Sequence, residues 1–214
     1  MAENVKRDYR SELRTAHAQE TRRSIIEAAS RLFVEHGYGA TTVDAIAEAA
    51  GVSRKTVFTA VGGKLELLKV ALDWAVAGDD QPIALQDRGA IRRLLEQDDP
   101  RTLLEAWAHV LVEIDARVAP LFQALEVAAG RDAAARELVE QSRRQRLDGA
   151  RTVVERLADL DALSDDRHLR EAVDVAWLAG DPALYDRLVR ERGWSKRRFE
   201  QWLADTLVGQ LLGG

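Results

Sequence analysis

Apolar residues recur every three to four positions along most of the chain, which is the period of an amphipathic α-helix. No stretch alternates between apolar and polar residues for long enough to predict a β-strand. In the first periodic segment, residues 18–35, the apolar positions are Ile25, Ile26, Ala29, Leu32 and Phe33. Gly37 follows and is well placed to end that helix in a left-handed conformation. The pattern predicts an all-α protein.

The same periodicity continues along the rest of the chain. It predicts helices at residues 43–50, 54–60, 64–77, 88–96, 101–118, 121–129, 132–158, 167–179, 183–192 and 195–212. The four prolines interrupt the pattern and are each expected at a helix boundary: Pro82, Pro100, Pro120 and Pro182. Residues 79–87 are expected to be a linker. We expect a leader and helix-turn-helix domain over residues 1–65 and a C-terminal helical bundle over residues 66–214.

Two of the short predicted helices have the spacing of a helix-turn-helix. Ala47 lies four residues before Gly51, which places a small residue where two helices cross and a glycine where the turn needs positive φ. Thr41, with Asp44 three residues later, is expected to begin the first helix as a capping box, and Ser53 is expected to cap the second. A plain helical corner in a bundle would show the same spacing.

The outer face of the second short helix favours a DNA-binding domain over a plain corner between two helices. Its outward residues are Ser53, Arg54, Lys55, Phe58 and Thr59. The segment from residue 51 to residue 65 carries three basic residues and no acidic residue. A recognition helix needs such a face, because polar groups read base edges and cations bind phosphates.

The amino-acid composition excludes several other classes of protein. Hydrophobic residues make up 46% of the 214 residues, which is enough for a buried core, and no uninterrupted apolar run is long enough to predict a transmembrane helix. Cysteine is absent and no secretory signal is visible, so we expect a cytoplasmic protein without disulfides. The net charge of −5 divides into +1 for residues 1–68 and −6 for the remainder, so any contact with DNA must be local.

Nothing in the sequence favours catalysis or a cofactor. The four histidines are far apart and form no metal-binding pair on a helix. No glycine-rich loop follows a predicted strand, so nucleotide-binding motifs are missing. We therefore expect neither an enzyme nor a metal or cofactor site, and a small helical-bundle enzyme is a remote alternative.

At residues 41–58, TTVDAIAEAAGVSRKTVF, the sequence closely resembles the tetracycline-repressor (TetR) family of bacterial transcriptional regulators. Lys64 and the pair Leu67-Leu68 match as well, as do Ala28-Ala29, Leu32-Phe33 and Gly37-Tyr38 in the preceding helix. The resemblance implies an N-terminal DNA-binding domain joined to a C-terminal domain that binds a small-molecule effector and forms a homodimer. It implies a repressor that binds a double-stranded, palindromic operator and is released by its ligand.

The resemblance also assigns roles to individual residues. Thr42 and Ser53 match positions whose side chains or amides touch phosphates, and Arg54 and Thr56 match recognition-helix positions. Lys64 matches the lysine at the start of the fourth helix, where a helix N-terminus already attracts phosphate.

Several positions depart from the family pattern. Lys55 stands where a small residue is usual, Phe58 lacks the hydroxyl of the usual tyrosine, and Ala60-Val61 replaces the usual His-Phe. These departures leave open an alternative, namely a helical interaction protein that has weakened or lost DNA binding. They also leave the operator sequence undetermined.

Basic residues also precede the first predicted helix. These are Lys6, Arg7, Arg10 and Arg14, followed by Arg22 and Arg23, with four acidic residues interleaved. We expect a solvated leader, and a flexible arm that reaches the minor groove of DNA is the alternative.

The predicted ligand site lies between two apolar stripes in the C-terminal half. Its candidate residues are Trp107, Leu111, Asp115, Phe122 and Arg146. Arg146 interrupts its stripe where an apolar residue is expected, so it is either a charged anchor for an acidic ligand or a structural ion-pair partner of Asp115 or Glu113.

The last helices carry more large apolar residues than two terminal helices need to cover one bundle. The candidates for a dimer interface are Trp177, Leu184, Tyr185, Leu188, Phe199, Trp202, Leu203 and Leu207. The alternative is that Trp177 and Trp202 simply close their own domain.

Overall fold

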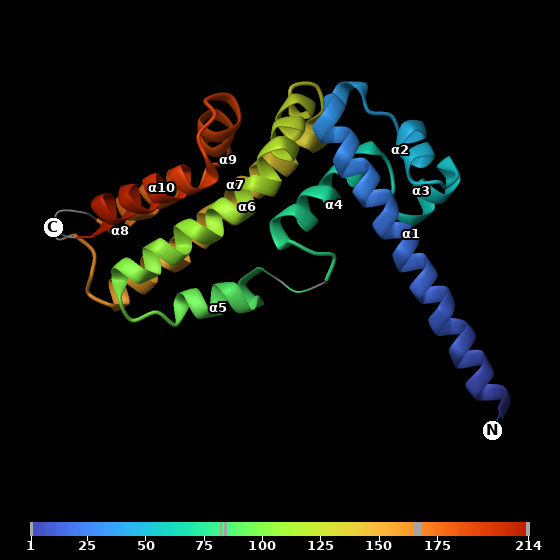
Figure 1. Ribbon diagram of the computed structural model, residues 1–214, viewed down its shortest axis with the longest axis horizontal. Coiled ribbons are helices and arrows are strands. Elements are labelled where there is room, and N and C mark those ends of the chain that lie inside the picture. Colours follow the sequence, from blue (N-terminus) through green and yellow to red (C-terminus); the bar gives the residue numbers. More distant parts are fainter. Residues whose placement is uncertain (1, 82, 84, 165–167, 213–214) are drawn as a thin grey trace. The chain divides into compact units, whose positions relative to one another are not determined.

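The computed structural model describes residues 2–81, 83, 85–164 and 168–212, and the side chains of residues 15–212 apart from those gaps and residue 86. Within these residues the chain is helical and forms no strand, so the all-α prediction is confirmed. The chain divides into two compact units, Met1–Trp74 and Ala75–Gly214. Figure 1 shows the elements of each unit. None of the described helices is long and apolar enough to span a lipid bilayer.

The N-terminal unit contains α1 (Ala2–Ala40), α2 (Val43–Ala49), α3 (Arg54–Ala60) and the start of α4 (Lys64–Ala77). The helices α1, α2 and α3 pack against one another. Apolar side chains form the core, namely Ile25, Ile26, Ala29, Phe33, Ile46, Ala47, Val57, Leu67 and Leu68. Helical periodicity therefore predicted the buried positions of α1 to α3, except that Leu32 is only half-buried.

The first helix is longer than predicted, because its backbone is helical from Ala2 rather than from residue 18. The prediction that the first helix begins near residue 18 was therefore wrong. The solvated leader stays a prediction, because the side chains of the four cations between residues 6 and 14 lie outside the described part. Arginine, glutamate, leucine and alanine are good helix formers, so this segment can be helical without an apolar stripe. The break predicted at Gly37 is confirmed, since this residue has non-helical angles, with φ 72° and ψ 172°.

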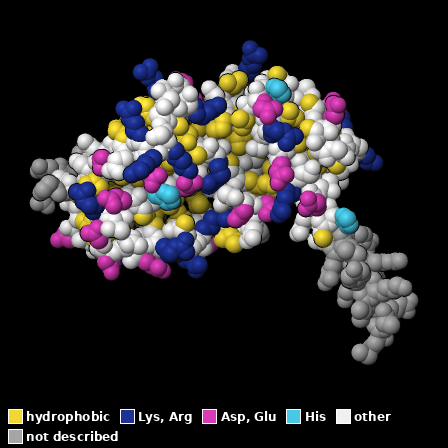
Figure 2. All heavy atoms as spheres, in the orientation of Figure 1, with side chains coloured by type: hydrophobic (Ala, Val, Ile, Leu, Met, Phe, Trp, Pro, Cys, Tyr) yellow, Lys and Arg dark blue, Asp and Glu magenta, His cyan; other side chains and the backbone are white. Residues whose placement is uncertain are grey.

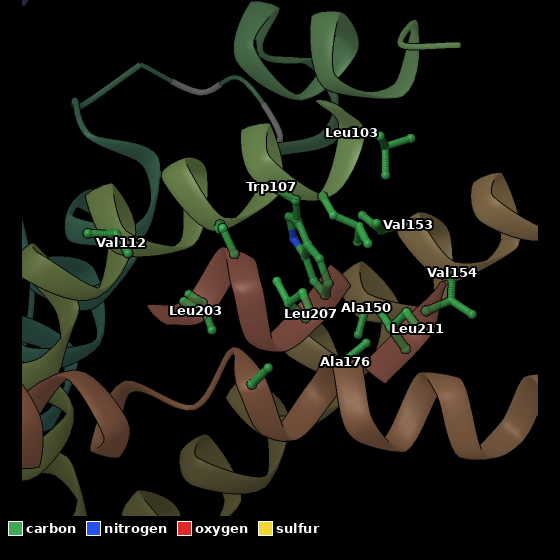
Figure 3. Packing of buried hydrophobic residues seen from close by; sticks show 14 of the residues in the cluster. Leu103, Trp107, Val112, Ala150, Val153, Val154, Ala176, Leu203, Leu207 and Leu211 are labelled. Carbon is green, nitrogen blue, oxygen red and sulfur yellow. The ribbon is translucent and has the colours of Figure 1, made fainter. Parts of the chain in front are cut away.

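The C-terminal unit begins with the short 3₁₀-helix η1 (Leu85–Asp87) and the helix α5 (Gly89–Leu95). The elements that follow are α6 (Pro100–Ala129), α7 (Ala133–Asp159), α8 (Leu169–Ala179), α9 (Pro182–Tyr185), the π-helix η2 (Asp186–Glu191) and α10 (Lys196–Leu211). The long helix α6 packs against both α7 and α10, and α7 packs against α8 (Figure 1). Figure 3 shows apolar side chains of α6, α7, α8 and α10 filling the space between these helices.

Pro120 lies inside α6, so the prediction of two helices separated at this residue was wrong. A proline in a helix removes one backbone hydrogen bond and usually kinks the chain. Here the residues on both sides, Ala119 and Leu121, are buried in the unit, and this burial holds the helix continuous. Pro100 and Pro182 each lie at the start of a helix, as predicted, whereas Pro82 lies outside the described residues.

The predicted linker begins with an ion pair. Arg88 donates to both carboxylate oxygens of Asp79, at 2.7 and 2.9 Å, and Gln81 N also donates to Asp79. These hydrogen bonds lower the pKa of Asp79 to about 2. These hydrogen bonds thus join Asp79, just after α4, to Arg88, just before α5.

Candidate nucleic-acid interface and ligand site

The helix α2 begins at a different threonine from the one predicted. Thr42 is its N-cap, and the Thr42 side chain accepts a hydrogen bond from Ala45 N at 3.1 Å. Thr41 is buried, and its hydroxyl lies 3.0 Å from Leu32 O and 2.8 Å from Gly37 O. The predicted capping role of Thr41 was therefore wrong. Thr41 instead ties the end of α1 to the start of α2, and Thr42 is left exposed at the surface.

The turn between α2 and α3 has the geometry of a helix-turn-helix. Gly51 has φ 67°, a left-handed conformation that glycine adopts without strain, as predicted. Val52 N donates to Ala47 O at 3.0 Å, which closes the turn, and Ala47 is buried.

The recognition helix candidate, α3, is short and is fixed at both ends. At its start, Ser53 accepts a hydrogen bond from Thr56 N at 3.1 Å, which confirms the predicted cap. At its end, the Arg22 guanidinium donates to Ala60 O at 2.5 Å. Val57 is completely buried between these points and anchors the inner face. Arg22, grouped in the sequence with the leader cations, is thus a structural residue that binds a carbonyl at the C-terminal end of α3.

The outer face of α3 exposes Arg54, Lys55, Phe58 and Thr59. The Phe58 side chain is the apolar centre of this face, with 47% of its surface exposed. The Thr59 hydroxyl donates to Lys55 O at 2.9 Å, so its oxygen can still accept a further hydrogen bond. The structure therefore places the predicted residues of this helix side by side on one accessible surface.

Arg54 has a partner that the sequence did not reveal. Its Nη1 lies 2.6 Å from Asp44 Oδ2 on α2, and its guanidinium carbon lies 5.5 Å from the centre of the Phe58 ring. Both members of the ion pair are exposed, so the pair contributes little to stability. It nevertheless orients the guanidinium across the outer face of α3, and any DNA contact by Arg54 must compete with Asp44.

Lys64, at the N-terminus of α4, is held against α1. Its ammonium nitrogen lies 4.3 Å from the centre of the Tyr38 ring and 3.4 Å from Gly39 O. Partial burial lowers the pKa of Lys64 below its ordinary value. Tyr38 in turn stacks on Phe33, with ring centres 5.9 Å apart. Sequence reasoning identified Lys64 but gave Tyr38 no role, because no spacing rule connects residues 38 and 64.

The five residues of the predicted ligand site do not all lie together. Trp107 belongs to the apolar core, where Figure 3 shows it between α6 and α10 near Leu207. Asp115 and Phe122 are buried, and the Arg146 guanidinium carbon lies 5.3 Å from the centre of the Phe122 ring. The candidates that lie close together are therefore Asp115, Phe122 and Arg146. Leu111 lies close to Gly180, the residue next to Asp181.

Arg146 forms an ion pair that differs from either one predicted. Its Nη2 donates to Asp181 Oδ2 at 3.4 Å, whereas Glu113 pairs with Lys196 at 2.5 Å. Burial raises the pKa of Asp115 to about 8, an effect that the charge of Arg146 opposes and that of Asp181 strengthens. Asp115 therefore holds a proton at neutral pH.

The candidates for a dimer interface are also divided by the structure. Four of them are buried within their own unit, namely Tyr185, Phe199, Leu203 and Leu207. The other four, Trp177, Leu184, Leu188 and Trp202, are partly exposed. Sequence reasoning missed Leu178 on α8, which is 60% exposed and is a large apolar side chain at the surface.

On the face shown in Figure 2, basic and acidic side chains are interspersed and no broad basic surface forms. Within the described part of the chain, no group of three or more histidine, aspartate or glutamate side chains could hold a metal ion.

Two consecutive helices joined by a tight glycine turn, with an accessible second helix, define a helix-turn-helix domain. Residues 25–71 match the family model for bacterial regulatory proteins of the tetR family. The similarity to the tetR family therefore covers the helix-turn-helix domain of this chain.

Comparison with curated proteins finds HTH-type transcriptional regulators. The HTH-type transcriptional regulator TtgR of Pseudomonas putida is 35% identical over 104 residues, which cover 45% of this chain and 50% of TtgR. The chain thus spans about half the length of the curated relatives it matches.

Comparison with solved structures extends the shared fold to most of the chain. The fatty acid degradation regulator FadR from Bacillus halodurans has a TM-score of 0.68 at 16% identity, covering 88% of this chain and 95% of FadR. SmeT, the repressor of the Stenotrophomonas maltophilia multidrug efflux pump SmeDEF, has a TM-score of 0.64 at 19% identity, covering 90% and 92%. SmeT has also been solved as a complex with triclosan. At these identities the comparison establishes the fold of both units.

Proposed function

We propose that this chain is a ligand-responsive transcriptional repressor that binds a palindromic DNA operator as a homodimer and is released by a small molecule. The observation that carries the proposal is the outer face of α3, which is accessible, contains no acidic residue and is fixed by a capped turn. Supporting it, TtgR is a transcriptional regulator and SmeT is a repressor solved with a small molecule.

In this proposal the residues of the helix-turn-helix contact different parts of the DNA. Arg54 and Thr59 read base edges, and Phe58 contacts a thymine methyl group. Lys55 and Lys64 bind phosphates as cations. Near the starts of α2 and α3, the exposed residues Thr42 and Ser53 and the partly buried Thr56 contact the backbone of the DNA.

A second candidate function is a helical interaction protein that no longer binds DNA. The Asp44–Arg54 ion pair is the observation that favours it, because Asp44 neutralises a cation on the proposed reading face. The two candidates differ in one measurable property, the affinity for a two-fold symmetric duplex relative to that for a scrambled duplex.

Fluorescence anisotropy with labelled duplexes from the region flanking the protein's own gene tests the proposal. We expect nanomolar-range, salt-sensitive binding to a two-fold symmetric site and much weaker binding to a scrambled duplex of equal length. Equal, weak affinity for all duplexes would support the interaction protein instead.

A further inference from the structure

Four side chains from three segments of the C-terminal unit lie close together, and we call them the Asp115 cluster. Asp115 and Phe122 lie on α6, Arg146 lies on α7, and Asp181 lies just before α9. The Arg146 guanidinium lies 5.3 Å from the centre of the Phe122 ring, and its Nη2 donates to Asp181. The turn between α8 and α9 approaches α6 closely at Gly180. A Cβ added at this glycine would lie 3.3 Å from a side-chain carbon of Leu111.

The Asp115 cluster contains buried polar atoms without hydrogen-bond partners. Asp115 is only 2% exposed, and its Oδ2 has no donor. The Nε and Nη1 atoms of Arg146 are buried without an acceptor. Unpaired buried polar atoms are uncommon because they are costly. Asp115 Oδ2 lacks a donor, whereas the two Arg146 atoms are donors that solvent would satisfy if the guanidinium moved outward.

The charges in the cluster favour a cation as the missing group. In the free protein Asp115 is protonated, and the Arg146–Asp181 ion pair carries no net charge. Ionisation of Asp115 then leaves one negative charge, which a bound cation would neutralise. The space over an aromatic ring and between carboxylates is a cation position, and the protein's own Arg146 now occupies it. An anion at this position would be repelled by Asp181, which already neutralises the charge of Arg146.

Arg146 is held loosely enough to be displaced. Its ion pair with Asp181 is long, at 3.4 Å, and the two side chains are 20% and 29% exposed. An arginine can keep its apolar stem buried while its charged head moves to solvent. Such a movement would uncover Phe122 and the Oδ2 atom of Asp115.

We propose that the Asp115 cluster is the effector site and that the effector is an organic amine, whose ammonium group donates to Asp115 Oδ2 and replaces the Arg146 guanidinium over Phe122. This rests on the proposed function, which supplies the need for an effector. It differs from the acidic ligand that was one of the two interpretations of Arg146 from the sequence. Because Asp115 is protonated in the free protein, the amine displaces a proton from its carboxyl group to solvent on binding.

Isothermal titration calorimetry of the full chain without DNA tests the proposal with two matched pairs of probes. Benzylamine is compared with benzoate, and phenylbutylamine with phenylbutyrate, at millimolar concentration. We expect the amines to bind and the carboxylates not to bind. Between about pH 6 and pH 8 the amine affinity should rise by about tenfold or more, since ionising Asp115 becomes less costly. Titration in buffers of different ionisation enthalpy should show about one proton released per amine bound.

Substitutions separate this site from a merely structural cluster. Asp115→Asn removes the charged acceptor and should weaken amine binding by about 10- to 100-fold and abolish proton release. Arg146→Met should retain or strengthen amine binding, because the cation position is vacated. Asp174→Asn, an exposed aspartate on α8, is the matched control and should change neither quantity.

Three outcomes would overturn the proposal. These are binding of the carboxylates in preference to the amines, no binding of either amine, or amine binding that Asp115→Asn leaves unchanged. Operator affinity, measured separately in the absence of any probe, remains a test of the DNA-binding function alone. Failure of the amine site and failure of the regulator can therefore be told apart.

Discussion

At the scale of single residues, burial decides what each charged pair can do. The Asp44–Arg54 pair is exposed on both sides, so solvent screens it and its value lies in orienting Arg54. Asp115 lies in the interior beside Arg146, where the same Coulomb interaction is much stronger and desolvation keeps the carboxyl protonated. In the two proposals made above, the exposed pair therefore orients a residue that contacts DNA, and the buried Asp115 links effector binding to proton release.

We expect Lys55→Ala and Lys64→Ala each to weaken binding to all DNA sequences and to reduce the salt slope by about one unit. The reason is that each lysine releases counterions when it neutralises a phosphate. Anisotropy titrations over a salt series measure the slope. Lys69→Ala, an exposed lysine further along α4, serves as the control. Unchanged operator affinity in the double variant would show that the proposed face does not bind DNA.

Asp115 should make stability depend on pH. Its folded-state pKa of about 8 lies above the ordinary value of 3.8, so between these values the folded state binds more protons than the unfolded state. The contribution is therefore fully present below about pH 4 and is lost as pH rises towards 8, with a slope of up to about 1.4 kcal/mol per pH unit. Chemical denaturation from pH 5 to pH 8 should show wild type losing stability relative to Asp115→Asn. Parallel curves for the two proteins would refute the assignment.

At the scale of elements, α3 is too short to be stable by itself. It is held by the Ser53 cap, by burial of Val57 and by the bond from Arg22 to Ala60 O. The helix-turn-helix geometry then depends on Gly51, whose φ is positive although no neighbouring atom lies within 4 Å of the position a Cβ would take. The requirement at this glycine is therefore conformational and not steric.

Gly51→Ala should destabilise the N-terminal unit by about 1–2 kcal/mol, because alanine is strained at φ 67°. Operator affinity should fall with it, since the angle between α2 and α3 depends on this turn. Gly149→Ala on α7 is a matched control with open space around it and should stabilise the chain by about 0.5–1 kcal/mol. Denaturation followed by circular dichroism measures both. A neutral or stabilising Gly51→Ala would contradict the structure of the turn.

At the scale of the whole molecule, one chain offers a single recognition helix. A palindromic operator needs two such helices about 34–36 Å apart, so the proposed function requires a two-fold dimer. The partly exposed Trp202 on α10 and the exposed Leu178 on α8 are the strongest interface candidates, because α8 packs against α10. Trp202 also contacts Phe199 and Trp194 within its own unit.

Leu178→Glu and Trp202→Glu should each separate the dimer and reduce operator binding, because a carboxylate cannot be buried unpaired in an interface. Analytical ultracentrifugation and anisotropy measure the two effects together. Leu178 is the safer position, since its exposure means that glutamate will not disturb the chain's own core. Val127→Glu on α6, similarly exposed, is the control. A wild-type monomer at micromolar concentration that binds its operator tightly would rule out this arrangement.

Features that depend on neighbours in the chain could be determined from the sequence. The helical class, the buried faces of the N-terminal helices, the Gly51 turn and the Ser53 cap all follow from spacings of one to four residues, because local hydrogen bonds and helix periodicity set them. The exposed cationic face of α3 was predictable for the same reason. Local rules failed at Pro120, where the burial of α6 outweighed local preference. They also failed in the capping role of Thr41, whose hydroxyl instead binds Leu32 O and Gly37 O at the end of α1.

Only the tertiary structure determined which charges meet. Arg146 pairs with Asp181, which is 35 residues away, and Arg22 binds the end of a helix 38 residues away. The same packing buries Asp115 and seals Phe199, Leu203 and Leu207 inside one unit. Spacing along the chain carries no information about such contacts, because they depend on how whole helices cross. The protonation of Asp115, and with it the chemistry of the proposed effector, was therefore decided by the packing of α6 against α7 and the turn before α9.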